Sequence, residues 1–246
     1  IPNGNRCSVV RDKRQSFIVR NTCSFDSLCQ ILVCTASHNN IYRDKIKDYT
    51  SPIFSCVNEL LRAGLSIKFY LNRVNALNIP QLKPENRRNR IIQIVATANI
   101  ANMATLMFQD YPSCIIEKRC ATYKKESVKR IIVMSVDFDM WMKDGATSLP
   151  DALYRGDSRP RLCCEEFPIC EIKYGLQLII ETAFGDDKLQ RLRDFPDRLI
   201  MPDNAGYQLA GIVVYEGIYN ANSVGHYIAY IKIGSIWLLF DDMKAK

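Results

Sequence analysis

The spacing of hydrophobic residues changes near the middle of the chain. In the first part, apolar residues recur at helical spacing after Cys23, and a second such run extends from Ser51 to Gly64. Both patterns predict amphipathic helices, each preceded by a residue type that caps helices. The stretch 88–109 contains no Gly or Pro and is rich in Ala, Ile and Met, which predicts one long buried helix. Between these helices, residues 75–89 contain two prolines and predict a connecting loop.

Beyond Pro112, β-branched and aromatic runs separated by turn residues predict strands. The predicted strands cover residues 130–138, 174–182, 208–215, 226–232 and 235–240. A helical first part followed by a strand-rich second part predicts an α+β protein. We expect a single domain over residues 1–246, with a helical portion at 1–112 and a strand-rich portion at 113–246.

Composition narrows the class of protein without identifying its function. A hydrophobic fraction of 48% with 24% charged residues is ordinary for a globular protein, and no apolar run is long enough to predict a membrane span. The net charge of +7 is densest at Arg11–Arg14, at 87–90 and at 124–130. We interpret these stretches as solvated surface rather than nucleic-acid contacts, and an acidic protein partner would suit them. The ten cysteines predict reduced thiols in a cytoplasmic or nuclear protein.

Only two histidines exist in the chain, which shortens the search for a general base. Cys23 lies where a strand-like segment turns into a helix, and free N–H groups at a helix N-terminus favour a thiolate. A catalytic thiol also needs an imidazole within hydrogen-bond reach. His38 lies at the far end of the same helix, on the order of 20 Å away at 1.5 Å per residue. His226 is therefore the candidate base.

The segment after His226 predicts a β-hairpin that places a carboxylate beside this histidine. If the tight turn is centred on Ile233 and Gly234, His226 lies directly opposite Asp241, with Cβ atoms roughly 5 Å apart. A shift by one residue would make Asp242 the neighbour instead. Taken singly, each residue also fits a structural role: a buried cysteine, a surface histidine and a hairpin that ends in acidic residues.

The segment around the candidate nucleophile reads Asn21-Thr22-Cys23-Ser24-Phe25-Asp26-Ser27-Leu28-Cys29-Gln30. It resembles the cysteine box of ubiquitin-specific proteases. Their histidine box is similar to the segment from Tyr207 to Gly217, to Gly225-His226-Tyr227-Ile228-Ala229-Tyr230, and to Trp237 with Phe240-Asp241-Asp242. The two boxes stand in the family's order and about 200 residues apart, and they cover about a quarter of the chain.

The resemblance implies a papain-like cysteine protease fold, with a helical thumb at 1–112 and strand-rich fingers and palm at 113–246. It implies an isopeptidase that cleaves after the C-terminal Gly-Gly of ubiquitin or a ubiquitin-like modifier, and no cofactor for catalysis. The catalytic residues would be Cys23, His226 and Asp241. Auxiliary residues would be Asn21, Thr22 and Asp242, and the modifier's tail would lie against Gly217, Gly225 and Tyr227.

Two departures from the family pattern affect what we expect of the enzyme. Ile18 stands where the family has an Asn that donates to the oxyanion, and losing such a donor costs on the order of 100-fold in rate. Backbone N–H groups of Thr22 and Cys23, or the Asn21 amide, would stand in for it. Asp26 replaces an Asn, as in the SUMO-cleaving branch of similar peptidases. The alternatives are therefore a SUMO isopeptidase, or a pseudoprotease that binds a modifier as a scaffold.

A second group of cysteines is similar in layout to the zinc ribbon that many members of this family carry. The group consists of Cys114 and Cys120, then Cys163, Cys164 and Cys170. Zinc takes four S or N ligands, which Cys114, Cys120, Cys164 (or its neighbour Cys163) and Cys170 would supply. The alternative is a metal-free finger held by its strands.

Overall fold

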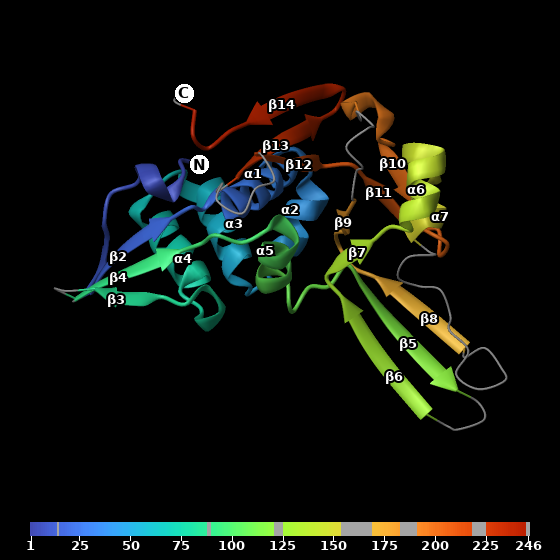
Figure 1. Cartoon of the computed structure of the whole chain (residues 1–246), viewed down its shortest axis with the longest axis horizontal. Helices are drawn as coiled ribbons and strands as arrows, with labels where there is room; N and C mark the ends of the chain where they lie inside the picture. The colour runs from blue at the N-terminus through green and yellow to red at the C-terminus, as the bar shows by residue number, and fades with distance from the viewer. Residues whose placement is uncertain are drawn as a thin grey trace. The chain divides into compact units, whose positions relative to one another are not determined.

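The computed structural model describes residues 1–13, 15–87, 90–120, 125–153, 169–182, 191–217 and 225–244. The chain forms two compact units: unit 1 comprises Ile1–Met107 and Ala210–Lys246, and unit 2 comprises Phe108–Leu209. Helices and strands occur in both, so the expected α+β class is confirmed (Figure 1). The expected division at residue 112 differs from this, because the C-terminal strands belong with the N-terminal helices.

Unit 1 contains a four-stranded sheet with the order β1-β2-β4-β3. Its strands are β1 (Val10–Asp12), β2 (Gln15–Arg20), β3 (Glu85–Arg87) and β4 (Ile91–Val95). The central pair, β2 and β4, runs parallel, with Ser16 opposite Ile91 and Arg20 opposite Val95. Phe17, Val19 and Ile94 are buried.

The predicted helix over 88–109 is wrong. Within it lie β4 and the shorter helix α5 (Ile100–Met107). The run Ile-Ile-Gln-Ile-Val is β-branched at four of five positions and pairs with β2, so strand pairing outweighs the helix-compatible composition of the stretch. The loop expected at 75–89 also holds structure: the end of α4, a 3₁₀ turn at Pro80–Leu82 and β3.

The helices of unit 1 include the two that the sequence predicts. The two predicted helices are α1 (Cys23–His38) and α3 (Pro52–Ala63). Besides α5, unit 1 also contains α2 (Asn40–Ile46) and α4 (Ile67–Leu77), and a 3₁₀ turn at Gly4–Arg6 precedes them all. Helix α3 begins with Pro52 in its first turn and ends at Gly64, whose φ of 66° suits a residue without a Cβ. Phe25, Phe54 and Phe69, from α1, α3 and α4, are fully buried.

The C-terminal sheet of unit 1 packs against α1. It consists of β12 (Gly211–Glu216), β13 (His226–Ile233) and β14 (Ile236–Phe240), all antiparallel. Ile228, Ala229 and Ile231 of the central strand are buried. The Ser27 hydroxyl of α1 donates to the Tyr227 carbonyl over 3.4 Å, so the start of the helix lies beside the start of β13 (Figure 1).

Unit 2 has its own sheets and its own core. Its strands are β5 (Cys114–Cys120), β6 (Lys125–Ile131), β7 (Val133–Ser135), β8 (Ile169–Tyr174), β9 (Ile179–Glu181), β10 (Arg198–Ile200) and β11 (Gly206–Gln208). The pairings are β6-β5-β8, β7-β9 and β10-β11. Two short helices, α6 (Phe138–Asp144) and α7 (Leu149–Leu153), flank a 3₁₀ turn at Gly145–Ser148, and a second such turn covers Leu192–Asp194. Ile116, Met134 and Trp141 lie in the core.

Two strands predicted in unit 2 are shorter than expected. The range 130–138 holds the end of β6, then β7, and reaches the first residue of α6. In the range 174–182, Tyr174 is the last residue of β8, and the one complete strand is the three-residue β9. The hydrophobic runs do form strands, but turns interrupt them at residues that the pattern does not mark.

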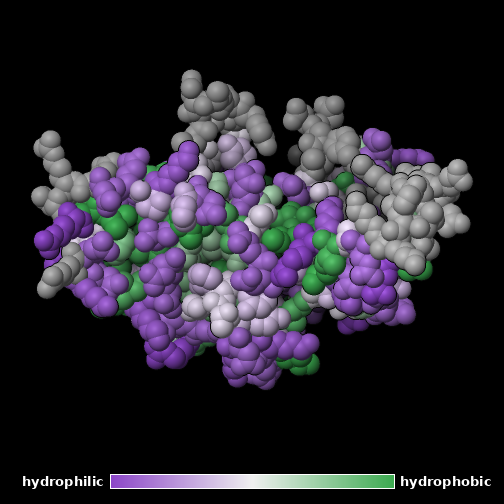
Figure 2. All heavy atoms as spheres, turned by 90° about the horizontal axis from the view of Figure 1, so that it is seen from below, coloured by the Kyte–Doolittle hydropathy of each residue, from purple (hydrophilic) through white to green (hydrophobic). Residues whose placement is uncertain are grey.

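Hydrophilic residues cover most of the face drawn in Figure 2, with hydrophobic ones between them. Within the described ranges, no helix is both long enough and apolar enough to cross a bilayer.

Candidate active site

Cys23 is the first residue of α1, as the sequence predicts. Thr22 precedes the helix, and its carbonyl accepts the backbone N–H of Asp26 over 2.8 Å. His38 is the last residue of the same helix, so the expectation that it lies far from Cys23 is confirmed. All eight cysteines in the described part of the chain are free thiols, and Cys23 is only half-buried.

His226 and Asp241 make the contact that the hairpin argument predicts. The His226 Nε2 atom lies 2.8 Å from Asp241 Oδ1. Because a carboxylate only accepts hydrogen bonds, Nε2 carries the proton and Nδ1 is left as the basic nitrogen. Oδ1 of Asp241 also accepts the Met243 backbone N–H over 3.0 Å, and Lys244 Nζ lies 3.3 Å from Oδ2. These hydrogen bonds outweigh the effect of burial and hold the pKa of the Asp241 carboxyl below its usual value.

The register behind that prediction is wrong by two residues. The turn is Gly234-Ser235, so Ile233 pairs with Ile236 and Ala229 pairs with Phe240. His226 and Asp241 are therefore diagonal neighbours just beyond the paired region rather than direct partners. A shift of two residues leaves every side chain on the same face of the sheet, and a diagonal neighbour is within reach of an imidazole.

Asp242 also approaches the histidine but is held by different partners. Its Oδ1 lies 3.6 Å from His226 Nε2, beyond hydrogen-bond distance. Its Oδ2 accepts the Asn3 side-chain amide over 2.7 Å, and its side chain is fully buried. Asp241 is thus the direct partner of the ring, and Asp242 belongs to a buried cluster behind it.

The sulfur of Cys23 faces the beginning of β13. It contacts the backbone N–H groups of Tyr227 and Ser24, which favour the thiolate. Burial nevertheless raises the pKa of the Cys23 thiol, and the carboxyl groups of Asp242 and Asp26 raise it further. The N–H group at the helix start thus favours the thiolate, as the sequence predicts, but burial and the two carboxyl groups outweigh it. Among the described residues, no hydrogen bond joins the thiol to the His226 ring.

The residues expected to stabilise an oxyanion have different surroundings. Ile18 lies within β2, opposite Gln93 of β4. Asn21 has a φ of 56°, donates its amide to Thr97 over 3.1 Å and accepts from Asn5 over 2.8 Å, so its side chain is committed to neighbouring loops. In the described part of the chain, no group accepts a hydrogen bond from the backbone N–H of Thr22 or Cys23. These two N–H groups are the donors that remain for an oxyanion.

The glycines expected to line the path of a modifier's tail are crowded by Tyr215. A Cβ on Gly225 would lie 1.8–2.0 Å from atoms of the Tyr215 ring, and one on Gly217 would lie 3.0 Å from the Gly225 Cα. The Tyr215 ring packs edge-on against Tyr227 at a centroid distance of 5.3 Å. Close packing around Tyr215 therefore explains why both positions hold glycine. Tyr215 is a residue of the candidate site that sequence reasoning missed.

The predicted set of four zinc ligands is wrong, because Cys114 and Cys120 occupy opposite ends of β5. Seven paired residues of extended strand separate their ends by about 20 Å, whereas two zinc ligands lie within a few Å of each other. Cys114 is instead fully buried in the hydrophobic core of unit 2. Cys170 pairs with Lys118, on the same face as Cys120. Cys164 lies outside the described residues, so a zinc site that used Cys120 and Cys170 stays a prediction.

Ligand-type atoms of His226, Asp241 and Asp242 lie within 4.8 Å of one another. Hydrogen bonds account for this grouping, since Asp241 accepts from the ring and Asp242 accepts from Asn3. The closeness of these three side chains therefore needs no metal ion to explain it.

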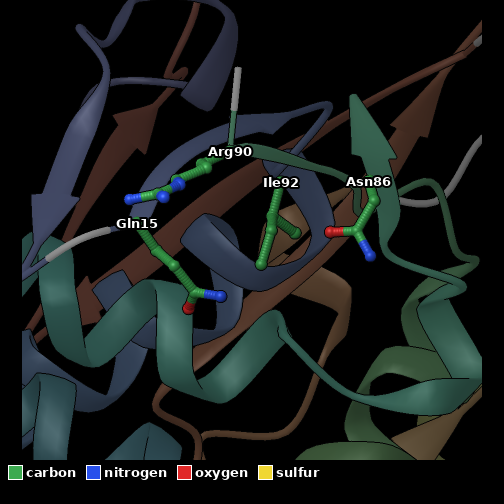
Figure 3. Close-up of a pocket in the computed structure, with 4 residues that line it drawn as sticks. All are labelled: Gln15, Asn86, Arg90 and Ile92. Carbon is green, nitrogen blue, oxygen red and sulfur yellow. The ribbon is translucent and has the colours of Figure 1, made fainter. Parts of the chain in front are cut away.

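A surface recess of about 380 Å³ lies away from Cys23, His226 and Asp241, at the start of β2 and β4. Gln15, Asn86, Arg90 and Ile92 line it (Figure 3). Cys23 follows the opposite end of β2, so the recess is at the far end of the sheet from the thiol. The same end carries Arg11 and Lys13, which are exposed, and the exposed Arg90.

A buried cluster behind the candidate triad of Cys23, His226 and Asp241 was also missed by sequence reasoning. It joins Asn3, Asp26, Arg73 and Asp242, each 3% exposed or less. Asp26 stood out only as a departure from a family motif, and Asn3 and Arg73 carried no sequence signal.

Comparison with models of known protein families gives no match, and comparison with characterised proteins gives none. The case for a function therefore rests on the geometry of unit 1 and on the two sequence motifs.

Proposed function

We propose that the chain is a cysteine isopeptidase that removes ubiquitin or a ubiquitin-like modifier. Cys23 is the nucleophile, His226 the general base and Asp241 the residue that orients the base. The main support is the 2.8 Å contact between His226 Nε2 and Asp241, on a strand whose next residue offers its N–H to the Cys23 sulfur. The class of substrate is inferred from the resemblance of the two motifs, which also suggests a papain-like fold with unit 2 as the fingers.

The chemistry follows from the positions of the atoms. Nδ1 of His226 takes the thiol proton as the sulfur attacks the carbonyl carbon of the modifier's terminal glycine. The oxyanion forms beside the backbone N–H groups of Thr22 and Cys23. The imidazolium then protonates the leaving lysine amine, and the C–N bond breaks to give a thioester on Cys23. His226 finally activates a water that hydrolyses the thioester. Because the reaction needs a reduced thiol, we place the enzyme in the cytoplasm or nucleus.

A second candidate is a pseudoprotease that binds a modifier without cleaving it. The raised pKa of the Cys23 thiol and the absence, among the described residues, of a thiol–imidazole hydrogen bond favour it. Ile18 in place of an amide donor supports it too. SUMO remains the alternative modifier, because Asp26 matches the SUMO-cleaving branch.

Ubiquitin and SUMO with a C-terminal propargylamide test these candidates together. We expect one of the two to form a covalent adduct, mapped by mass spectrometry to Cys23. Cys23→Ala should form none, whereas Cys34→Ser, a matched change further along α1, should react like the native chain. Binding without an adduct would favour the pseudoprotease. Neither binding nor an adduct would mean that the chain does not act on these modifiers.

A further inference from the structure

The buried cluster behind the triad contains two acidic side chains and one cationic one. Asp26 comes from the first turn of α1, Asp242 follows the end of β14, Arg73 comes from α4, and Asn3 lies near the beginning of the chain. All four are at least 97% buried. Buried charges are costly unless they are paired, so the distribution of charge among these groups matters.

Arg73, the cation of the cluster, forms its ion pair with Asp26. Arg73 Nη1 lies 3.2 Å from Asp26 Oδ1 and 3.4 Å from Oδ2. The Thr22 hydroxyl donates to the same carboxylate. The guanidinium carbon of Arg73 lies 5.3 Å from the ring centroid of Tyr70, which further fixes the cation. Asp26 therefore has the counter-charge that an ionised buried carboxylate needs.

In the described ranges, no lysine or arginine pairs with Asp242. Asn3 holds it at two points, with the side-chain amide on Oδ2 at 2.7 Å and the backbone N–H on the Asp242 carbonyl at 3.1 Å. Its other oxygen, Oδ1, is buried, and no donor among the described residues reaches it. The Asp26 carboxyl group acts on Asp242 as a neighbouring negative charge, which disfavours ionisation of Asp242.

The groups around Asp242 act on its protonation in opposite directions, and those that favour the neutral acid outweigh the others. Burial and the negative charge of Asp26 raise the pKa of Asp242 to about 7, although Asn3 and His226 oppose the change. Burial also raises the pKa of Asp26, but Arg73 opposes it there. Cys23 of α1 faces the same carboxyl group and is neutral as a thiol.

We propose that Asn3 and Asp26 form a clamp on Asp242, in which Asn3 fixes its position and the negative charge of Asp26 keeps it a neutral acid, so that Asp241 is the single carboxylate presented to His226. Asp242 is then a positioning residue, and the clamp explains how two adjacent aspartates near one imidazole avoid competing for it. When Asp242 loses its proton, a second negative charge develops 3.6 Å from Nε2 and opposes formation of the Cys23 thiolate. The clamp deepens the proposed function, because it describes the same catalytic group.

The test compares rates of Cys23 alkylation by iodoacetamide from pH 5 to 9, followed by peptide mass spectrometry. This readout requires no modifier, so it separates failure of the clamp from failure of the proposed function. We expect Asp242→Asn, which stays neutral, to match the native rate at pH 6 and to exceed it about three- to tenfold at pH 8. One unit of thiol pKa corresponds to a tenfold change in thiolate.

The ionisation of Asp242 should appear as an inflection in the pH profile of the Cys23 alkylation rate. Two further variants should move the pH of this inflection in opposite directions, which a merely structural role would not do. Asn3→Leu removes a donor that favours ionised Asp242, so the inflection should move to higher pH. Asp26→Asn removes the neighbouring negative charge, so it should move to lower pH. Asp44→Asn, an exposed carboxyl change on α2, should leave the profile unaltered.

Carbon-13 NMR of the aspartate carboxyl groups, assigned with Asp242→Asn, keeps the question decidable if a variant of the cluster fails to fold. In the native chain, Asp242 should titrate near pH 7. The contribution of Asp242 to stability should accordingly be fully present below about pH 4 and be lost as the pH rises through 7, because its folded-state pKa is the higher one. Titration of Asp242 near its ordinary value of about 4, with identical rate profiles in all variants, would overturn the clamp.

Discussion

Asp241 and Asp242 are identical and adjacent, yet their surroundings assign them opposite states. Asp241 accepts hydrogen bonds from His226, Met243 and Lys244, which hold its pKa down. Asp242 is buried beside Asp26, which raises its pKa to about 7. Pairs of titratable groups whose environments separate their pKa values are a recurring feature of acid–base catalysis. The divergence between these two neighbours supports a catalytic rather than a merely structural interpretation of the group.

A first prediction follows for Asp241. Asp241→Asn should lower kcat/KM for a modifier–fluorophore substrate by about 10²–10⁴, because an amide at this position can stabilise the wrong tautomer of His226 and cannot stabilise the imidazolium. KM should change little, since Asp241 does not touch the substrate. A loss of less than threefold, in a variant with native thermal stability, would show that Asp241 does not orient the base.

The candidate triad was predictable from single residues, and the cluster behind it was not. Two histidines and one thiol at a helix start leave few possible pairs of nucleophile and base. Side chains alternate between the two faces of a strand, so a register error of two residues still places Asp241 on the face of His226. Asn3 and Arg73 carry no comparable signal. Their importance arises from contacts with residues 239 and 47 positions away in the chain, which local patterns do not encode.

At the scale of elements, errors occurred where a partner segment decides the outcome. The hairpin was predicted in the right place but two residues out of register, because the turn uses Gly234 and Ser235 rather than Ile233 and Gly234. Gly234 adopts a φ of 60°, which suits glycine at this turn. The helix expected at 88–109 failed for a similar reason, since β2 supplies a pairing edge that the composition of that stretch does not reveal.

A second prediction concerns the approach of β12 to the start of β13. In Gly225→Ala, the new methyl group would overlap the Tyr215 ring, which must swing away from Tyr227. Displacing Tyr227 would move the N–H that contacts Cys23, and misplacement by about 1 Å can cost on the order of 100-fold in rate. We expect a 10- to 100-fold lower rate of adduct formation with the modifier probe.

The double variant Gly225→Ala, Tyr215→Ala provides the control for this prediction. Removing the ring removes the overlap, so the double variant should react faster than Gly225→Ala alone. Gly206→Ala, where an added Cβ meets nothing within 4 Å, should react like the native chain. If the double variant is no faster than Gly225→Ala, the glycine acts through something other than Tyr215, such as direct contact with the modifier's tail.

At the scale of the whole chain, every residue of the candidate site belongs to unit 1, although the sequence of unit 2 separates Cys23 from His226. The two motifs therefore meet because residues 1–107 and 210–246 fold together. Unit 2 has a separate hydrophobic core built from its own residues. Weakening that core should leave the chemistry of Cys23 intact.

The last prediction tests this independence with Ile116→Ala. Ile116 is fully buried in unit 2, so the change should lower that unit's free energy of unfolding by about 2–5 kcal/mol. The chain has two tryptophans, Trp141 in the core of unit 2 and Trp237 on β14 of unit 1, and fluorine NMR of 5-fluorotryptophan resolves them in one sample. In a urea titration, Ile116→Ala should shift the Trp141 transition to lower urea and leave the Trp237 transition and the Cys23 alkylation rate within twofold of native values. Equal shifts of both tryptophan signals would mean that the two cores unfold together, and that the candidate site depends on unit 2 for its stability.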